Sequence, residues 1–108
     1  MYRPLGPAEL ALVKESGFKK WPPRLQGQSI FYPVANETYA KEITIQWNVR
    51  DYGVGYVARF SVRKPFVENY LLHKVGNKEH YEWWIPAEDL EELNRNIVGK
   101  IDIVGEYR

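Results

Sequence analysis

Residues 79–90 decide how this chain folds, and they are Glu79-His80-Tyr81-Glu82-Trp83-Trp84-Ile85-Pro86-Ala87-Glu88-Asp89-Leu90. Successive side chains of a strand point to opposite faces, so the odd-numbered residues share one face and the even-numbered residues share the other. The odd-numbered face is mainly aromatic and aliphatic, which is typical of a core. The even-numbered face carries His80, Glu82 and Trp84, which set a carboxylate between two rings and make this face a possible functional site.

Pro86 ends this strand in the sequence pattern. Proline has no N–H to donate to a strand partner, but it fits the first turn of a helix. Glu88 and Asp89 then suit the positive N-terminal end of that helix, which we expect to end near Asn96. The segment therefore predicts a strand, a sharp turn and a helix.

The rest of the chain alternates between strand and helix patterns. Apolar and β-branched runs predict strands over residues 1–5, 29–34, 56–63, 71–75 and 100–106, with residues 76–78 as a hairpin loop. Helices are expected over 7–16 and over 37–48, the second capped by Asn36 and carrying an apolar stripe of Tyr39, Ile43 and Trp47. Residues 18–28, which include Trp21, predict an extended surface loop. This order indicates an α+β fold with a mostly antiparallel sheet and two to three helices.

Composition narrows the class of protein. The chain has 108 residues, which predicts a single domain over 1–108. Fifteen Lys and Arg face 14 Asp and Glu, giving a net charge of +1 that argues against broad neutralisation of nucleic-acid phosphates. The chain has no Cys and two His, so neither a disulfide framework nor a recognised metal motif is expected. With no apolar stretch long enough to span a bilayer, we expect a cytoplasmic protein without a membrane partner.

Glu82 and Arg3 are the two charged candidates for a functional site. A carboxylate held between Trp84 and His80 can hydrogen-bond a sugar hydroxyl and stabilise a cationic transition state. The alternative is that this face is the solvent side of an edge hairpin. An Arg on the first strand can hold a phosphate through two parallel hydrogen bonds, or it can form an ordinary surface ion pair.

Aromatic residues of segment 30–40 are the next candidates. Phe31, Tyr32 and Tyr39 surround a strand that leads into a helix, and their rings can stack on a nicotinamide or a base, or else pack in the core. Arg59 and Arg63 share one strand face, which must be solvated or line a groove because a core does not tolerate unpaired charge.

Four segments together suggest a family: 2–10 (YRPLGPAEL), 21–25 (WPPRL), 30–34 (IFYPV) and 82–90 (EWWIPAEDL). They resemble small bacterial proteins labelled ADP-ribosylation/crystallin J1, and the strand order resembles a minimal ADP-ribosyltransferase fold. The resemblance implies that Arg3 holds the phosphates or ribose of NAD and that Tyr32 packs on nicotinamide. It also implies that Glu82, or its neighbour Glu79, bonds the ribose 2′-hydroxyl as the catalytic carboxylate. Tyr39 and Trp84 complete the NAD-binding set that we expect.

Three hypotheses about function follow. The first is an NAD-dependent ADP-ribosyltransferase-like domain, active or degenerate, with a protein or nucleic acid as acceptor. The second is a non-catalytic module that recognises a nucleotide, a nucleic acid or a protein through Trp21, Arg24, Arg59 and Arg63. The third is an accessory domain with no small-molecule site.

Overall fold

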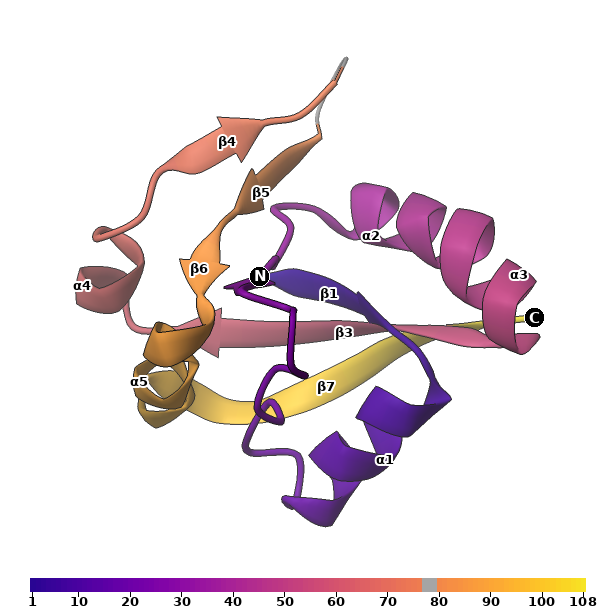
Figure 1. Ribbon diagram of the computed structural model, residues 1–108, viewed down its shortest axis with the longest axis horizontal. Coiled ribbons are helices and arrows are strands. Elements are labelled where there is room, and N and C mark those ends of the chain that lie inside the picture. Colours follow the sequence, from indigo (N-terminus) through magenta and orange to yellow (C-terminus); the bar gives the residue numbers. More distant parts are fainter. Residues whose placement is uncertain (77–79) are drawn as a thin grey trace.

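A computed structural model describes residues 1–76 and 80–108 of the chain (Figure 1). Its helical segments are α1 (Pro7–Glu15), α2 (Glu37–Ile43), the π-helical turn η1 (Thr44–Asn48), α3 (Val49–Tyr52), α4 (Lys64–Val67), the 3₁₀ turn η2 (Ala87–Asp89) and α5 (Leu90–Arg95). Its strands are β1 (Tyr2–Leu5), β2 (Ile30–Phe31), β3 (Gly55–Val62), β4 (Leu72–Lys74), β5 (Tyr81–Trp83), β6 (Ile85–Pro86) and β7 (Ile97–Tyr107).

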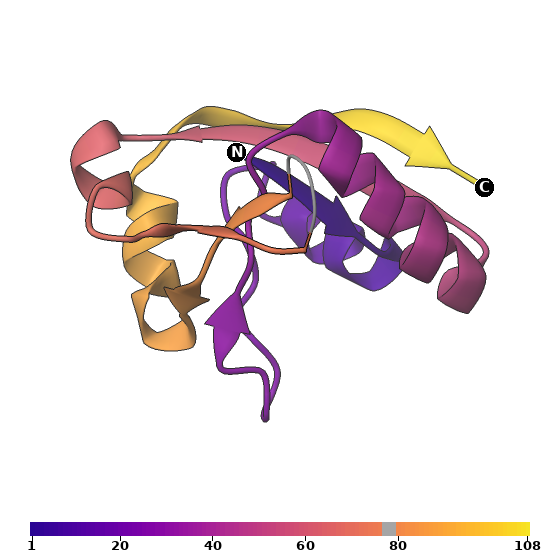
Figure 2. The same ribbon diagram turned by 90° about the horizontal axis from the view of Figure 1, so that it is seen from above.

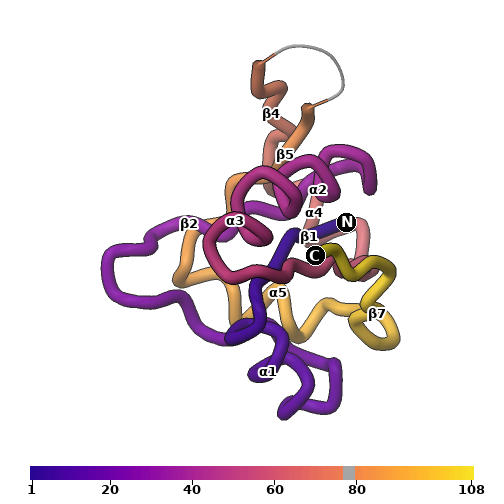
Figure 3. The backbone as a smooth tube through the Cα atoms, turned by 90° about the vertical axis from the view of Figure 1, so that its right-hand side faces the viewer, coloured from indigo at the N-terminus to yellow at the C-terminus, as the bar shows by residue number. Residues whose placement is uncertain are grey.

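The centre of the fold is an antiparallel sheet with the strand order β1-β3-β7. β3 lies in the middle, with Arg3 of β1 opposite its Ala58 and with two register shifts along its pairing with β7. Figure 3 looks along these strands and shows α2 and α3 on one side of the sheet and α1 on the other. Helix α5 packs near the far end of the sheet, beside the turn that contains α4 (Figure 1).

Segment 33–35 connects this sheet to the β4–β5 hairpin. Val34 bridges Tyr2 on one side and Glu82 on the other, both in antiparallel sense. Backbone hydrogen bonds from Tyr2 N to Val34 O (2.9 Å) and from Trp83 N to Pro33 O (2.9 Å) reinforce the two bridges. β1 and β5, which are far apart in the sequence, therefore lie on either side of the same short segment.

Two hydrophobic clusters stabilise the sheet from its two sides. The larger lies between the sheet, α1, α5 and β2–β6, and includes Trp21, Phe31, Phe60 and Leu93. The smaller lies under α2 and consists of Val34, Ala40 and Val57 with their partly buried neighbours. β3 contributes to both clusters, because Ala58 belongs to the larger one and Val57 to the smaller one, and both residues are fully buried. A register shift in the pairing with β7 lies between these two residues.

The predicted α+β class with antiparallel sheets is confirmed. The described residues form about four helices when α2, η1 and α3 are counted as one continuous helix, which exceeds the two to three expected. The strand expected over 56–63 is β3, shifted by one residue. The strand expected over 100–106 is β7, which begins earlier at Ile97. Of the expected hairpin loop, residues 77 and 78 lie outside the described residues.

The helix predicted over 37–48 continues to Tyr52 and contains a π-helical turn. Asn36 caps it as expected, because its side chain accepts a hydrogen bond from Tyr39 N. The predicted apolar stripe is wrong at Trp47, which is 52% exposed, while Thr44 is buried. A π-turn widens the helical repeat, so a residue spaced for an α-helix rotates off the buried face.

Three other expectations need correction. Trp21 does not lie on a surface loop but is 1% exposed in the core, where its ring meets those of Phe31 and Phe60. Of the strand expected over 29–34, only Ile30–Phe31 forms a strand, because Pro33 has no N–H to extend the ladder. Pro86 pairs with Ile30 in β6, and the helix begins after it through a 3₁₀ turn. No helix among residues 1–76 and 80–108 is long and apolar enough to cross a membrane.

Candidate functional site

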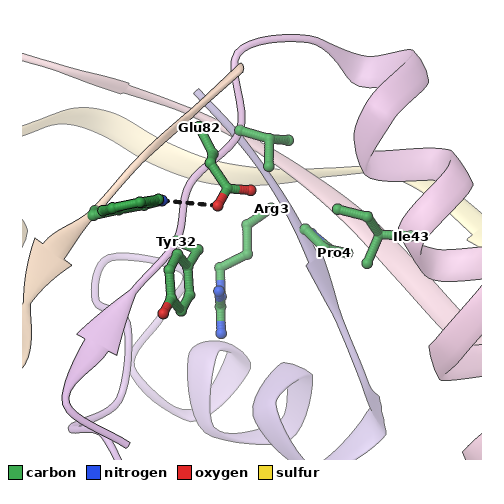
Figure 4. Close-up of a pocket in the computed structure, with 7 residues that line it drawn as sticks. Arg3, Pro4, Tyr32, Ile43 and Glu82 are labelled. Carbon is green, nitrogen blue, oxygen red and sulfur yellow. Dashed lines mark hydrogen bonds between the residues drawn. The ribbon is translucent and has the colours of Figure 1, made fainter. Parts of the chain in front are cut away.

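A cavity of about 430 Å³ opens between strand β1, the segment after β2, helix α2 and strand β5. We call it the Glu82 cavity. It is lined by Arg3, Pro4, Tyr32, Val34, Ile43, Glu82 and Trp84 (Figure 4). Four of these, namely Arg3, Tyr32, Glu82 and Trp84, are residues that the sequence singled out. Their convergence follows from the two bridges of Val34, which set β1 and β5 on either side of one residue.

The Glu82 carboxylate is held by two donors, one at each oxygen. Trp84 donates its indole N–H to Oε1 at 2.8 Å, and Tyr39 donates its hydroxyl to Oε2 at 3.0 Å. Trp84 comes from the same strand segment, whereas Tyr39 comes from α2. An ionised carboxylate accepts about four hydrogen bonds, so two donors fix its plane and leave lone pairs for a ligand.

Each of these donors carries a histidine ring stacked on it. His73 of β4 lies parallel to Trp84 at 3.8 Å between ring centroids, and His80 lies parallel to Tyr39 at 4.3 Å. His80 Nε2 is in turn 3.0 Å from Glu42 Oε2 on α2. The stacked rings restrict the rotamers of Trp84 and Tyr39, which makes the orientation of Glu82 depend on the β4–β5 hairpin and α2 together.

The Tyr39 hydroxyl is poised to donate rather than to ionise. Burial, and then the hydrogen bond to Glu82, raise the pKa of Tyr39 to about 12. The negative charges of Glu82 and Glu42 act in the same direction. Tyr39 therefore stays a neutral donor at all physiological pH values.

Arg3 contributes its stem to the cavity, but its guanidinium is already paired. Nε and one terminal nitrogen bind the two oxygens of Glu9 on α1 at 2.6 and 2.8 Å. The guanidinium also lies 4.4 Å from the centre of the Phe31 ring. Figure 4 shows the side chain running away from the Glu82 carboxylate. Since an Arg has five N–H donors, some remain for a ligand on the other edge.

Outcomes differ among the residues expected to bind NAD. Arg3, Tyr32, Glu82 and Trp84 line one cavity, and Tyr32 is 43% exposed there. Tyr39 does not line the cavity, but its hydroxyl donates a hydrogen bond to Glu82. Glu79, the alternative carboxylate, lies outside the described residues.

Sequence reasoning missed several members of the site. Glu9 is the partner of Arg3, and no periodicity links them because the chain turns between β1 and α1 at Gly6. Val34 and Ile43 line the cavity as ordinary apolar residues, which carry no signal of a site. His80 was visible as a neighbour of Glu82 on the strand, but its stacking on Tyr39 was not.

The residues that suggested a binding module lie in different environments. Trp21 is in the core, and Arg24 lines a separate hollow beside α1. Arg59 is 53% exposed with Asp102 at 3.9 Å, and Arg63 donates to the backbone O of Arg95 at 3.1 Å. Figure 2 shows β3 and β7 along one side of the molecule, with β2 and the loop before it projecting on the opposite side.

Comparisons with known proteins add no family to this picture, because neither protein-family models nor curated proteins nor solved structures gave a match. Among the described residues, no three His, Asp or Glu side chains lie close enough together to hold a metal ion.

Proposed function

We propose that the Glu82 cavity binds NAD and that the protein is an ADP-ribosyltransferase-like domain. One observation carries the proposal: Arg3, Tyr32 and the pair Glu82 and Trp84, drawn from three separate segments, line one cavity of about 430 Å³. Clustering of an oriented carboxylate, an arginine and exposed rings in one hollow is characteristic of a ligand site. The likeness of the predicted strand order to a minimal ADP-ribosyltransferase fold supports NAD as that ligand.

Glu82 has the chemistry that this reaction requires. In ADP-ribosyl transfer, the bond between the nicotinamide nitrogen and the ribose carbon C1′ breaks, and nicotinamide leaves with the bonding electrons. The ribose passes through an oxocarbenium-like state, and a nucleophile from the acceptor then bonds to C1′. A carboxylate that accepts the ribose 2′-hydroxyl stabilises this developing positive charge. Tyr39 and Trp84 hold Glu82 in place beforehand, so little reorganisation is needed.

The aromatic and basic residues would position the dinucleotide around Glu82. Tyr32 presents an exposed ring that suits stacking on nicotinamide. His73 stacks on one face of the Trp84 ring, so the other face and the edge of that ring are left to the cavity. The diphosphate would extend past the stem of Arg3, which lines the cavity, to the edge of the guanidinium that Glu9 leaves free.

The test compares Glu82→Gln with the wild-type protein in NAD binding and in nicotinamide release. The substitution keeps the shape of the side chain but removes the charge, so we expect nicotinamide release to fall by about 100-fold or more. We expect the Kd for NAD to change far less. Glu106→Gln, an exposed residue paired with Arg108 on β7, is the matched control. Absence of NAD binding at millimolar concentration, or equal rates in Glu82→Gln and wild type, would remove the proposal.

A further inference from the structure

A second, larger cavity of about 550 Å³ lies on the other side of Arg3. We call it the Arg24 cavity. It runs between the start of α1 and the segment before β2, and its charged lining residues are Arg3, Glu9 and Arg24. Arg3 and Pro4 also belong to the Glu82 cavity, so the two hollows share a wall.

Positive charge in the Arg24 cavity exceeds negative charge. Glu9 is the one carboxylate among the lining residues, and Arg3 binds both of its oxygens at 2.6 and 2.8 Å. Arg24 reaches Glu9 only at 3.8 Å. Its Nε is buried and finds no hydrogen-bond partner among the described residues. A buried donor without an acceptor costs free energy, so the guanidinium of Arg24 is left incompletely paired by the protein itself.

Two further features favour an anion here. Burial, and next the charge of Arg3, lower the pKa of Arg24 from its ordinary value, while the charge of Glu9 acts in the opposite direction. The N-terminal end of α1 also faces the cavity through Gly6, Pro7 and Ala8, and Gly6 offers no side-chain cap. The positive end of the helix dipole adds to the field of the two arginines.

The rim of the Arg24 cavity is apolar. Leu12 is 50% exposed, Leu25 is 72% exposed and Tyr52 is 63% exposed, and all three line this cavity. Exposed large apolar side chains grouped around a buried charge suit a ligand that carries both an anionic and an apolar part.

We propose that the Arg24 cavity binds an organic anion, a carboxylate or phosphate monoester attached to an apolar or aromatic group. The oxyanion bonds Arg24 beside the Arg3–Glu9 pair, and the apolar group packs on Leu12, Leu25 and Tyr52. This binding does not require NAD in the Glu82 cavity, so it stands or falls independently of the proposed enzyme activity.

The test is an NMR titration of the isotopically labelled protein with three aromatic probes. Phenyl phosphate and benzoate are the two anionic probes, and benzyl alcohol is the uncharged one. We expect saturable shifts at the amides of Leu12, Leu25 and Tyr52 with the anions, and binding of benzyl alcohol that is at least about tenfold weaker. The tighter of the two anions identifies the preferred group. Equal binding of benzyl alcohol, or shifts centred on Tyr32 and Trp84, would overturn the proposal.

Charge variants at the rim test the same point without disturbing the core. Leu25 is exposed, so Leu25→Glu and Leu25→Lys leave the buried arginines in place. Both variants lose the apolar contact of Leu25, so they are compared with each other: Leu25→Lys should bind phenyl phosphate at least about fivefold more tightly than Leu25→Glu, as expected for charges close to one another near a surface. Arg24→Met should abolish saturable binding, with circular dichroism as the check on folding. Equal affinity in the two Leu25 variants would contradict the assignment of the anion to this cavity.

Discussion

At the scale of single residues, the site depends on how Glu82 is held. Its two oxygens accept from the Tyr39 hydroxyl and the Trp84 indole, and each ring is covered by a histidine. Of the two donors, Tyr39 is the one that titrates. The same bond that orients the carboxylate therefore links the stability of the protein to pH.

Tyr39 makes stability fall at high pH. Its pKa rises from about 10 in the unfolded chain to about 12 in the folded protein. The folded state keeps the proton that the unfolded state loses, so the contribution of Tyr39 is complete below pH 10 and is lost as pH rises through 12. Tyr39→Phe should remove this loss, measured as the urea-dependent free energy of unfolding across that range.

Tyr70 is the control for this measurement. Burial and its hydrogen bond to Asp89 also raise its pKa, so it adds its own decline in stability at high pH. Tyr70→Phe should remove that part alone and leave the part that belongs to Tyr39. An unchanged slope in Tyr39→Phe would show that the Tyr39–Glu82 bond does not form in solution.

At the scale of elements, the π-helical turn η1 sits where the helix packs on β3. Thr44 is fully buried, and its hydroxyl donates to Ala40 O at 2.8 Å and approaches Tyr56 O at 3.3 Å. A hydroxyl that bonds the carbonyl four residues back competes with the helix ladder. Gly55 of β3 lies directly against this turn.

Gly55→Ala should destabilise the protein by about 2–3 kcal/mol, the usual cost of overpacking a well-packed interior. A Cβ at Gly55 would lie 2.5 Å from Thr44 Cγ2 and 2.7 Å from Asn48 Cβ, which belong to a packed helix. Gly105→Ala is the control, because its Cβ would meet only the end of the Tyr107 ring, which can swing away. Chemical denaturation of both variants measures the difference. Equal losses in the two would refute the tight packing of η1 on β3.

Individual elements were predictable wherever local chemistry decides them. The alternation of β3 and the Asn36 cap follow from the identities of neighbouring residues. The split expected for residues 79–85 into a core face and an exposed face is wrong in β5, where Tyr81, Glu82 and Trp83 are all half-buried. Trp47 was misplaced because a π-turn leaves no mark in the apolar spacing. Trp21 was misplaced because two prolines beside it indicate a loop, and a loop residue enters the core only through tertiary contacts.

At the scale of the whole molecule, Asn94 joins the N-terminal loop to α5. Its side chain accepts from Trp21 N at 2.9 Å and donates to Trp21 O at 3.0 Å. This pair spans 73 residues of sequence and fixes the backbone that carries Trp21 into the core. The helix that follows the Glu82 strand is thus tied to the first third of the chain.

Asn94→Ala should lower the free energy of unfolding by about 2 kcal/mol, because it leaves two backbone groups of Trp21 without partners. Asn69→Ala is the matched control, since Asn69 makes one exposed bond to Pro65 O at 3.2 Å. Its loss should be within about 0.5 kcal/mol. Urea denaturation monitored by tryptophan fluorescence measures both. A loss at Asn94 no larger than that at Asn69 would show that the connection does not stabilise the fold.

The meeting of Arg3 and Glu82 in one cavity lies beyond what local sequence patterns can predict. Nothing in the spacing of 79 positions between them indicates a shared cavity, and the expectation that they meet came only from a likeness of the predicted strand order to an ADP-ribosyltransferase fold. Pairing between distant strands depends on the register of the whole sheet, which the intervening chain sets. The pairing of Arg3 with Glu9 depends likewise on the turn at Gly6.

Val34 is bridged to β1 on one side and to β5 on the other, so the spacing between the strands that bear Arg3 and Glu82 depends on the length of this one segment. A single residue inserted or deleted between Pro33 and Asn36 would turn the side chains that follow it in this segment to the opposite face. Such a change would shift the register in which this segment bridges Tyr2 and Glu82, and so would displace the Glu82 carboxylate relative to Arg3. Natural variation between Pro33 and Asn36 should thus be far narrower in length than in composition.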